Sequence, residues 1–128
     1  MSMKYLQRID ENAASYPDCT AIETSTGASM TYGELWRASE AIAAFIRSSN
    51  IPEHEPVIVY GHKNPQMVAC FLGGLKSGHP SVPIDMHSVP DERAKAIAAQ
   101  IGDPLIFDLG GGVAVHCRLA LRDVCPAA

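Results

Sequence analysis

A carboxylate and two imidazoles are the residues of this 128-residue sequence that come nearest to a chemical site. Asp85 and His87 follow one short strand-like segment, and His62 follows an earlier one. A carboxylate beside an imidazole can pass a proton or supply metal ligands. The sequence has no tight HxxxH spacing and no paired CxxC spacing, so ordinary hydrogen-bonding roles are the favoured interpretation over a metal site.

Asp85 is the most informative single carboxylate. It lies just past the C-terminal end of a predicted strand, where open α/β sheets commonly place binding groups. Two structural roles remain open beside that one: Asp85 can cap the loop before the helix that Pro90 starts, or it can pair with Arg93. The structural roles are the favoured interpretation.

The glycine-rich segments do not predict a phosphate site. Residues 73–78 read GGLKSG, but a phosphate loop needs four residues between its first glycine and the Gly-Lys pair. This segment also ends a helix, where carbonyl groups repel anions. Residues 110–112 read GGG and precede a strand-like segment, so we interpret them as a turn.

The sequence offers no nucleophile in a catalytic setting. Cys70 lies on a predicted helix face and Cys19 in a loop, and neither has a base nearby in the pattern. No Gly-x-Ser-x-Gly elbow is present. All four cysteines, including Cys117 and Cys125, are predicted to be free thiols, because none has paired spacing. We therefore assign no catalytic, cofactor-binding or metal-binding residue from the sequence.

Charge and hydropathy argue against nucleic acid and membrane partners. The chain has 10 Lys and Arg against 14 Asp and Glu, and no basic stripe. No apolar run approaches the ~20 residues of a membrane helix, and residues 1–10 do not read as a signal peptide. The sequence predicts a cytoplasmic protein that does not insert into membranes.

Hydrophobic periodicity predicts helices and strands in alternation. The expected helices cover residues 4–15, 32–48, 65–77 and a segment that opens across 88–91 and ends at 101. The expected strands cover residues 20–24, 28–30, 57–60, 81–84, 105–107 and 113–116. Pro83 removes one amide and indicates an edge or strand-end position.

Helix ends give the clearest local signals. Thr31 and Glu34 have the spacing of a capping box. Asn64 can cap a helix whose first residue is Pro65, and Gly78 is a natural left-handed stop. Residues 57–107 then read as two consecutive βαβ crossovers, so we predict a single α/β domain over residues 1–128. Its sheet should be open and mainly parallel, with helices on both faces.

A family resemblance comes from short motifs in a fixed order. Residues 30–35 read MTYGEL, and residues 75–85 read LKSGHPSVPID. Between and around them stand VYGH (59–62), PxM (65–67), FLG (71–73), KxGH (76–79), PxD (83–85) and PxxR (90–93). The string resembles the N-terminal part of the D-alanine–D-alanyl carrier protein ligases, also called D-alanine–poly(phosphoribitol) ligases, of the adenylate-forming superfamily.

The resemblance implies a larger enzyme. That enzyme would react D-alanine with ATP and magnesium to give an aminoacyl adenylate. It would then pass the acyl group to the phosphopantetheine thiol of a small carrier protein, for D-alanylation of teichoic acid. The family's phosphate loop, adenine-binding segment, ribose-binding aspartate and catalytic lysine have no counterpart here, and Lys76 matches a motif lysine at a helix end instead. A smaller departure is at residues 80–81, where the family has a small residue and an aromatic.

We therefore expect a fragment of the N-terminal subdomain, natural or engineered, that is inactive by itself. Its partners would be the rest of the ligase chain and the carrier protein. Two alternatives stay open: a standalone α/β binding or regulatory module without catalysis, and a fragment of a peptide-synthetase adenylation domain. We also expect the isolated chain to self-associate through an open sheet edge or an uncovered helix face.

Overall fold

The computed structural model describes residues 4–102, 104–109 and 118–119. Its elements, in chain order, are α1 (Lys4–Ser15), β1 (Thr20–Glu23), β2 (Ser29–Thr31), α2 (Tyr32–Ser48), β3 (Val57–Gly61), α3 (Pro65–Ser77), β4 (Ser81–Asp85), α4 (Asp91–Ile101), β5 (Ile106–Asp108) and β6 (Arg118–Leu119). The bounds of α1 to β5 lie within one residue of the predicted ones, apart from the start of α4, and β6 was not predicted. The strand predicted over residues 113–116 and the turn over 110–112 lie outside the described residues.

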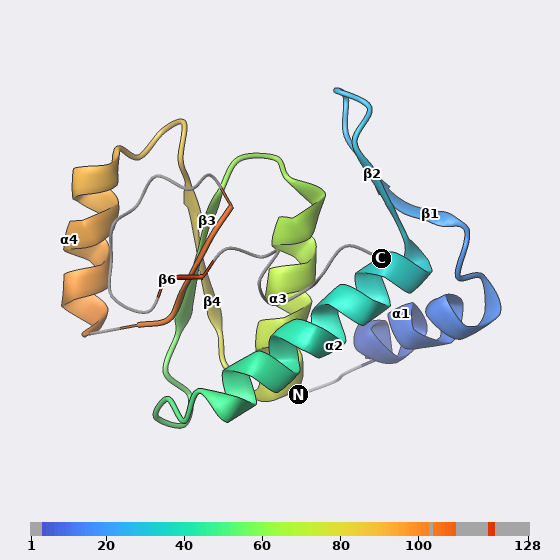
Figure 1. Cartoon of the computed structure of the whole chain (residues 1–128), viewed down its shortest axis with the longest axis horizontal. Helices are drawn as coiled ribbons and strands as arrows, with labels where there is room; N and C mark the ends of the chain where they lie inside the picture. Colours follow the sequence, from blue (N-terminus) through green and yellow to red (C-terminus); the bar gives the residue numbers. More distant parts are fainter. Residues whose placement is uncertain (1–3, 103, 110–117, 120–128) are drawn as a thin grey trace.

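The main sheet of the described chain is parallel, in the order β4-β3-β5-β6. The α3 crossover joins the neighbours β3 and β4, as predicted. The α4 crossover is different, because it carries the chain over β3 to the far side of the sheet, where β5 pairs with β3. Strands β1 and β2 form a separate antiparallel hairpin, which projects from the body of the molecule in Figure 1.

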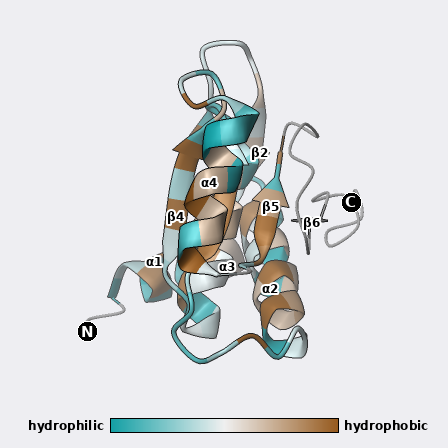
Figure 2. Cartoon of the chain, turned by 90° about the vertical axis from the view of Figure 1, so that its left-hand side faces the viewer, coloured by the Kyte–Doolittle hydropathy of each residue, from teal (hydrophilic) through white to brown (hydrophobic). Residues whose placement is uncertain are grey.

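Helices cover both faces of this sheet, which confirms the predicted architecture (Figure 1). The odd-numbered residues Val57 and Val59 of β3 face the core shared with α1, α2 and α3. The even-numbered Ile58 and Tyr60 face the smaller core under α4, which Figure 2 shows covering the sheet. Burial on both faces explains why β3 is a continuous apolar run and not an alternating one.

Two glycines let α3 pack closely on its neighbours, Gly73 against α2 and Gly74 against the segment that leads into β4. A Cβ added to Gly73 would stand 2.5 Å from Cγ2 of Ile42, and one added to Gly74 would stand 2.9 Å from the carbonyl oxygen of His79. Glycine inside a helix costs about 1 kcal/mol relative to alanine. Here that cost is offset, because a side chain on Gly73 would force α2 and α3 apart and one on Gly74 would collide with the backbone at His79. The glycine pair therefore serves packing, consistent with its rejection as a phosphate loop.

The predicted helix caps are present. The amide of Glu34 donates to Oγ1 of Thr31 at 3.1 Å, and Oε1 of Glu34 accepts from the amide of Thr31 at 2.9 Å. Oδ1 of Asn64 accepts from the amide of Gln66 at 2.9 Å. Gly78 ends α3 with φ 82°, a left-handed conformation that glycine adopts without strain.

The start of α4 differs from the sequence prediction. The helix begins at Asp91 after Pro90, with no side-chain cap, whereas it was expected to open as early as Ser88. Ser88 Oγ instead donates to Oδ2 of Asp85 at 2.9 Å. This hydrogen bond helps to close the loop after β4, and Pro90 occupies the N-cap position of α4.

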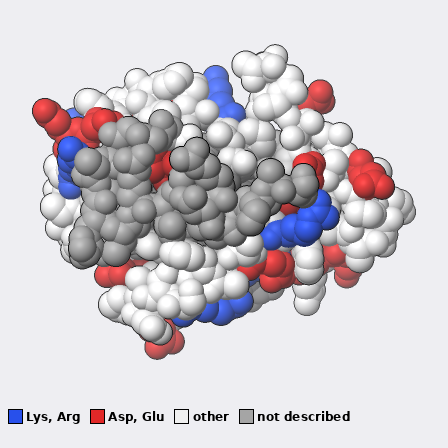
Figure 3. Space-filling view, in the orientation of Figure 1, with Lys and Arg blue, Asp and Glu red and all other residues white. Residues whose placement is uncertain are grey.

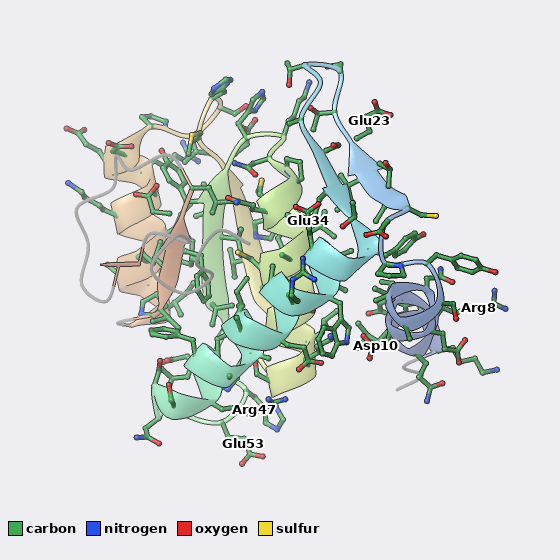
Figure 4. All side chains as sticks on the ribbon, turned by 45° about the vertical axis from the view of Figure 1, so that its right-hand side comes forward. Arg8, Asp10, Glu23, Glu34, Arg47 and Glu53 are labelled. Atoms are coloured by element: carbon green, nitrogen blue, oxygen red, sulfur yellow. The ribbon has the colours of Figure 1, made fainter. Side chains whose placement is uncertain are left out.

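Lys76 connects three helices. Its Nζ donates to Oδ1 of Asp10 on α1 at 3.2 Å, and to Oγ of Ser39 and Oε1 of Glu40 on α2 at 2.9 and 3.2 Å. Its side chain is only 10% exposed. The Lys76 ammonium does not bond the carbonyl groups at the end of α3. Arg47 from α2 does so, because its Nη2 donates to the carbonyl oxygen of Lys76 at 2.9 Å. Arg47 stands near the C-terminal end of α2 in Figure 4.

The surface carries both signs of charge. In the view of Figure 3, Lys and Arg side chains are interspersed with Asp and Glu side chains on the visible face. Within the described residues, every helix is too short or too polar to cross a membrane.

Candidate functional site

The candidate site lies at the C-terminal edge of the parallel sheet. The register pairs Gly61 of β3 with Asp85 of β4, so the loops that follow the two strands begin side by side. On the other flank, Tyr60 pairs with Asp108 of β5. Since β4 and β5 lie on opposite sides of β3, the chain changes direction at this edge, which is where open α/β sheets place ligands.

The structure brings together the three residues that the sequence singled out. His62 Nδ1 lies 2.7 Å from Oδ1 of Asp85, and the amide of His87 donates to the same oxygen at 3.1 Å. The imidazoles of His62 and His87 stack with ring centroids 3.6 Å apart and planes 18° apart. His62, Asp85 and His87, which we call the His–Asp cluster, join the loop after β3 to the loop after β4.

The hydrogen bonds of the cluster fix its protonation. The bond from His62, followed by the bonds from the His87 amide and the Ser88 hydroxyl, lowers the pKa of Asp85 to about 2. An ionised carboxylate only accepts hydrogen bonds, so Nδ1 of His62 must carry a proton. The loop-capping role of Asp85 is thereby confirmed, and no ion pair between Asp85 and Arg93 occurs in the described residues.

Tyr60 supports the same edge from beneath. Its side chain is buried in the core under α4, and its hydroxyl lies 2.8 Å from Oδ1 of Asp91 and 3.0 Å from the carbonyl oxygen of Val89. Burial, reinforced by Asp91, raises the pKa of Tyr60 to about 12. The hydroxyl is therefore a hydrogen-bond donor that fixes the start of α4 against β3.

Two cavities border the His–Asp cluster. The larger, about 540 Å³, lies between the turn of the β1–β2 hairpin and the loop after β3, and its wall includes Thr24, Thr26 and Lys63. The smaller, about 260 Å³, lies between the loop after β3 and the end of β4, and its wall includes Met67 and Asp85. His62 and Lys63 line both cavities, so this short loop separates them.

The residues at this edge do not fit a phosphate or a magnesium ion. At the N-terminus of α3, the amides of Gln66 and Met67 already donate to Asn64, and Pro65 has no amide proton. The usual anion site at a helix start is thus occupied by the cap. Across the part of the chain that the structure describes, no group of three His, Cys, Asp or Glu side chains could hold a metal ion.

Comparison with known proteins places this geometry in a family. Residues 9–118 match the AMP-binding enzymes, a stretch that includes the capped helix α2, the strands β3 to β5 and the His–Asp cluster. The chain belongs to the AMP-binding enzyme family.

Relatives within this family are ligases. The chain is 37% identical over 111 residues to the D-alanine–D-alanyl carrier protein ligase of Bacillus licheniformis, a match that covers 87% of this chain and 22% of the ligase. It is 39% identical over 125 residues to the ligase of the same name from Bacillus velezensis, covering 97% of this chain and 24% of the ligase. The resemblance predicted from the motifs is confirmed. The chain spans less than a quarter of the length of these relatives.

Solved structures of AMP-binding enzymes share the fold. The nonribosomal peptide synthetase FmoA3, in its α-methyl-L-serine-AMP bound form, superposes with TM-score 0.78 at 24% identity, over 94% of this chain and 14% of that one. The fatty acid AMP ligase from Legionella pneumophila gives 0.73 at 19% identity, over 97% of this chain and 25% of that one. The N-terminal subdomain of Klebsiella oxytoca NpsA gives 0.69 at 20% identity, over 95% of this chain and 33% of that one.

The cysteines have no place in the site of this AMP-binding family member. Cys70 is buried in the core on α3 and Cys19 is exposed before β1, and neither forms a disulfide bond. Cys117 and Cys125 lie outside the described residues.

Sequence reasoning missed the stacking of His62 on His87 and the contacts of Lys76. Both depend on segments that are distant in sequence. The available signal was the parallel register, which predicts that the residues after β3 and β4 meet.

Proposed function

We propose that this chain forms the N-terminal part of an ATP-dependent ligase that activates D-alanine as an aminoacyl adenylate and transfers it to the phosphopantetheine thiol of a carrier protein. The supporting observation is the 37–39% identity to D-alanine–D-alanyl carrier protein ligases over 87–97% of the chain. The end use would be D-alanylation of teichoic acid. Because ATP is the co-substrate, we place the protein in the cytoplasm.

In this proposal, the described residues act as scaffold. The capping box of α2, the glycine contact between α2 and α3, and the parallel sheet position a wall, and ATP and Mg²⁺ would bind to other segments of the whole enzyme. The start of α3 offers no free amides and the described residues offer no metal cluster, so no step of the reaction is assigned to them. Catalysis in the whole enzyme would then depend on positioning and charge stabilisation by those other segments.

A chimera tests this function. The 125 residues of this chain that match the Bacillus velezensis ligase would replace the matching segment of that ligase, and ATP–pyrophosphate exchange would be measured with D-alanine and with other amino acids. We expect exchange that depends on D-alanine. A matched chimera carrying Gly73→Trp should lose exchange together with its cooperative thermal transition, because the side chain would separate α2 from α3. A folded chimera that activates a different amino acid, or none, contradicts the proposal.

We also propose that the isolated chain self-associates, through α1 and α2 and not through the edge of β4. The residues that flank β4 and bond to β3 are Pro80 and Met86, both even-numbered. The backbone groups of odd-numbered residues therefore point away from β3. Pro83 is one of these and has no amide proton, which makes this edge unfavourable for pairing with another strand. The exposed large hydrophobic side chains of the described residues are Tyr5, Tyr16 and Trp36, on or beside α1 and α2. Light scattering should show a dimer that Trp36→Gln weakens. A monomer at every concentration would count against this.

A further inference from the structure

The His–Asp cluster combines three titratable groups whose charges depend on one another. Asp85 faces His62 at 2.7 Å, and the rings of His62 and His87 stack 3.6 Å apart. The side chain of His62 is 28% exposed and that of Asp85 is 43% exposed, so protons from solvent reach both groups. Asp85 and His87 lie at the loop after β4 and His62 lies in the loop after β3. Among the described residues, the bond from the Met86 amide to the Gly61 carbonyl joins the same two loops.

The number of protons on the two imidazoles decides whether these contacts attract. When His62 is protonated and His87 is neutral, the His62 imidazolium pairs with the Asp85 carboxylate and stacks on the neutral His87 ring. Both contacts are favourable. With a proton on both rings, two cations face each other at 3.6 Å, and Asp85 can neutralise only one of them. Acidification therefore converts the stack from an attractive contact into a repulsive one.

The surroundings do not cancel this repulsion. Lys63, on the same loop as His62, lines both cavities and adds positive charge. On α4, Asp91 is committed to the Tyr60 hydroxyl, and Asp108 is buried on β5, which pairs with β3 on the side opposite β4. The hairpin contributes Thr24, Ser25 and Thr26 to the larger cavity, and none of these side chains is charged. Asp85 remains the counter-ion of the stacked rings.

We propose that His62, His87 and Asp85 form a proton-sensitive clasp between the loop after β3 and the loop after β4. The clasp holds the two loops together while the stacked rings carry at most one added proton. It lets the loops separate when both rings are charged. Because the pKa of Asp85 is lowered to about 2, the carboxylate stays ionised while the histidines titrate. Histidine side chains change charge in the range of about pH 5 to 8. Release would move His62, and with it the wall that separates the two cavities. This device is independent of the proposed ligase function.

Nuclear magnetic resonance of the isolated chain tests the clasp. Ring signals of the histidines and amide protection of Met86 would be followed from about pH 8 to pH 4, the range in which histidine titrates. We expect the second proton on the His62–His87 pair to bind about tenfold more weakly than the first, as for two unit charges about 4 Å apart in nearly aqueous surroundings. Protection of the Met86 amide should fall by about the same factor as the second proton binds.

Two variants and one control complete the experiment. His87→Phe keeps a flat ring against His62 but takes no proton, so the second step and the loss of Met86 protection should both disappear. His87→Gln should likewise convert the titration of His62 into a single step. His54→Gln, at an exposed position beside Glu53, should leave both readouts unchanged. The proposal is overturned when His62 and His87 titrate independently, with curves that do not move when the other ring is replaced.

Discussion

Asp85 organises the loop after β4 through three short hydrogen bonds. Its carboxylate accepts from His62, from the His87 amide and from the Ser88 hydroxyl, at 2.7, 3.1 and 2.9 Å. The sequence placed Asp85 at the end of a strand and left its role open between binding and capping. The structure assigns it capping, and it adds the partner that no local pattern could provide, because His62 comes from the neighbouring strand.

The lowered pKa of Asp85 predicts how acid affects stability. The group has a pKa of about 2 in the folded chain against an ordinary value of 3.8, so the unfolded chain binds the proton more tightly. The stabilising contribution of Asp85 is complete above pH 3.8 and is lost as the pH falls toward about 2. Urea unfolding midpoints measured between pH 5 and pH 2 should therefore drop less steeply in Asp85→Asn than in the wild type.

The control for this experiment is Asp18→Asn, at an exposed position between α1 and β1. This variant should keep the pH dependence of the wild type. Parallel curves for the wild type and Asp85→Asn would show that the carboxylate does not stabilise the fold through these bonds.

At the scale of elements, α1 depends on few contacts. Its buried residue is Leu6, and α1 packs chiefly against α2. The ammonium of Lys76 reaches Asp10 across this junction and also bonds Ser39 and Glu40. Since α1 leads directly into the β1–β2 hairpin, the Lys76 contacts also help to hold the hairpin that walls the larger cavity.

Replacing Lys76 with methionine should loosen α1 selectively. The variant keeps an unbranched side chain that is one atom shorter, but it leaves Asp10 and Glu40 without their shared cation. Both carboxylates are about two-fifths exposed, at 43% and 41%, so water moderates the loss. We expect the free energy of unfolding to fall by about 1–2 kcal/mol. Amide exchange should quicken first in α1.

Lys63→Met is the matched control, because Lys63 lies on an exposed loop and makes no ion pair in the described residues. Its free energy of unfolding should change by no more than about 0.5 kcal/mol. Equal losses in the two variants would show that the junction does not depend on the Lys76 ammonium.

Most element bounds followed from local chemistry. The caps at Thr31 and Asn64 and the stop at Gly78 are signals contained within four residues, and each occurs where the sequence predicted it. The start of α4 falls at the last residue of the predicted range 88–91, because Ser88 belongs to the loop after β4, where it bonds Asp85, and Pro90 takes the N-cap position.

At the scale of the molecule, the sequence predicted a parallel sheet with helices on both faces but not the order of its strands. Alternating strands and helices require crossovers, yet they do not say on which side of β3 the chain returns. The order β4-β3-β5 results from α4 passing over the sheet to cover the face that α3 leaves open. The pairing of β3 with β4 brings His62, Asp85 and His87 together at one edge, and β5 completes the other flank of β3.

The central claim is that this chain forms scaffold of an AMP-binding enzyme and does not bind the nucleotide by itself. Isothermal titration of the isolated chain with ATP and Mg²⁺, with and without D-alanine, tests it most directly. The account predicts no saturable heat in either titration, although the chain is folded and the chimera is active. Saturable, stoichiometric binding of ATP to the isolated chain would contradict it.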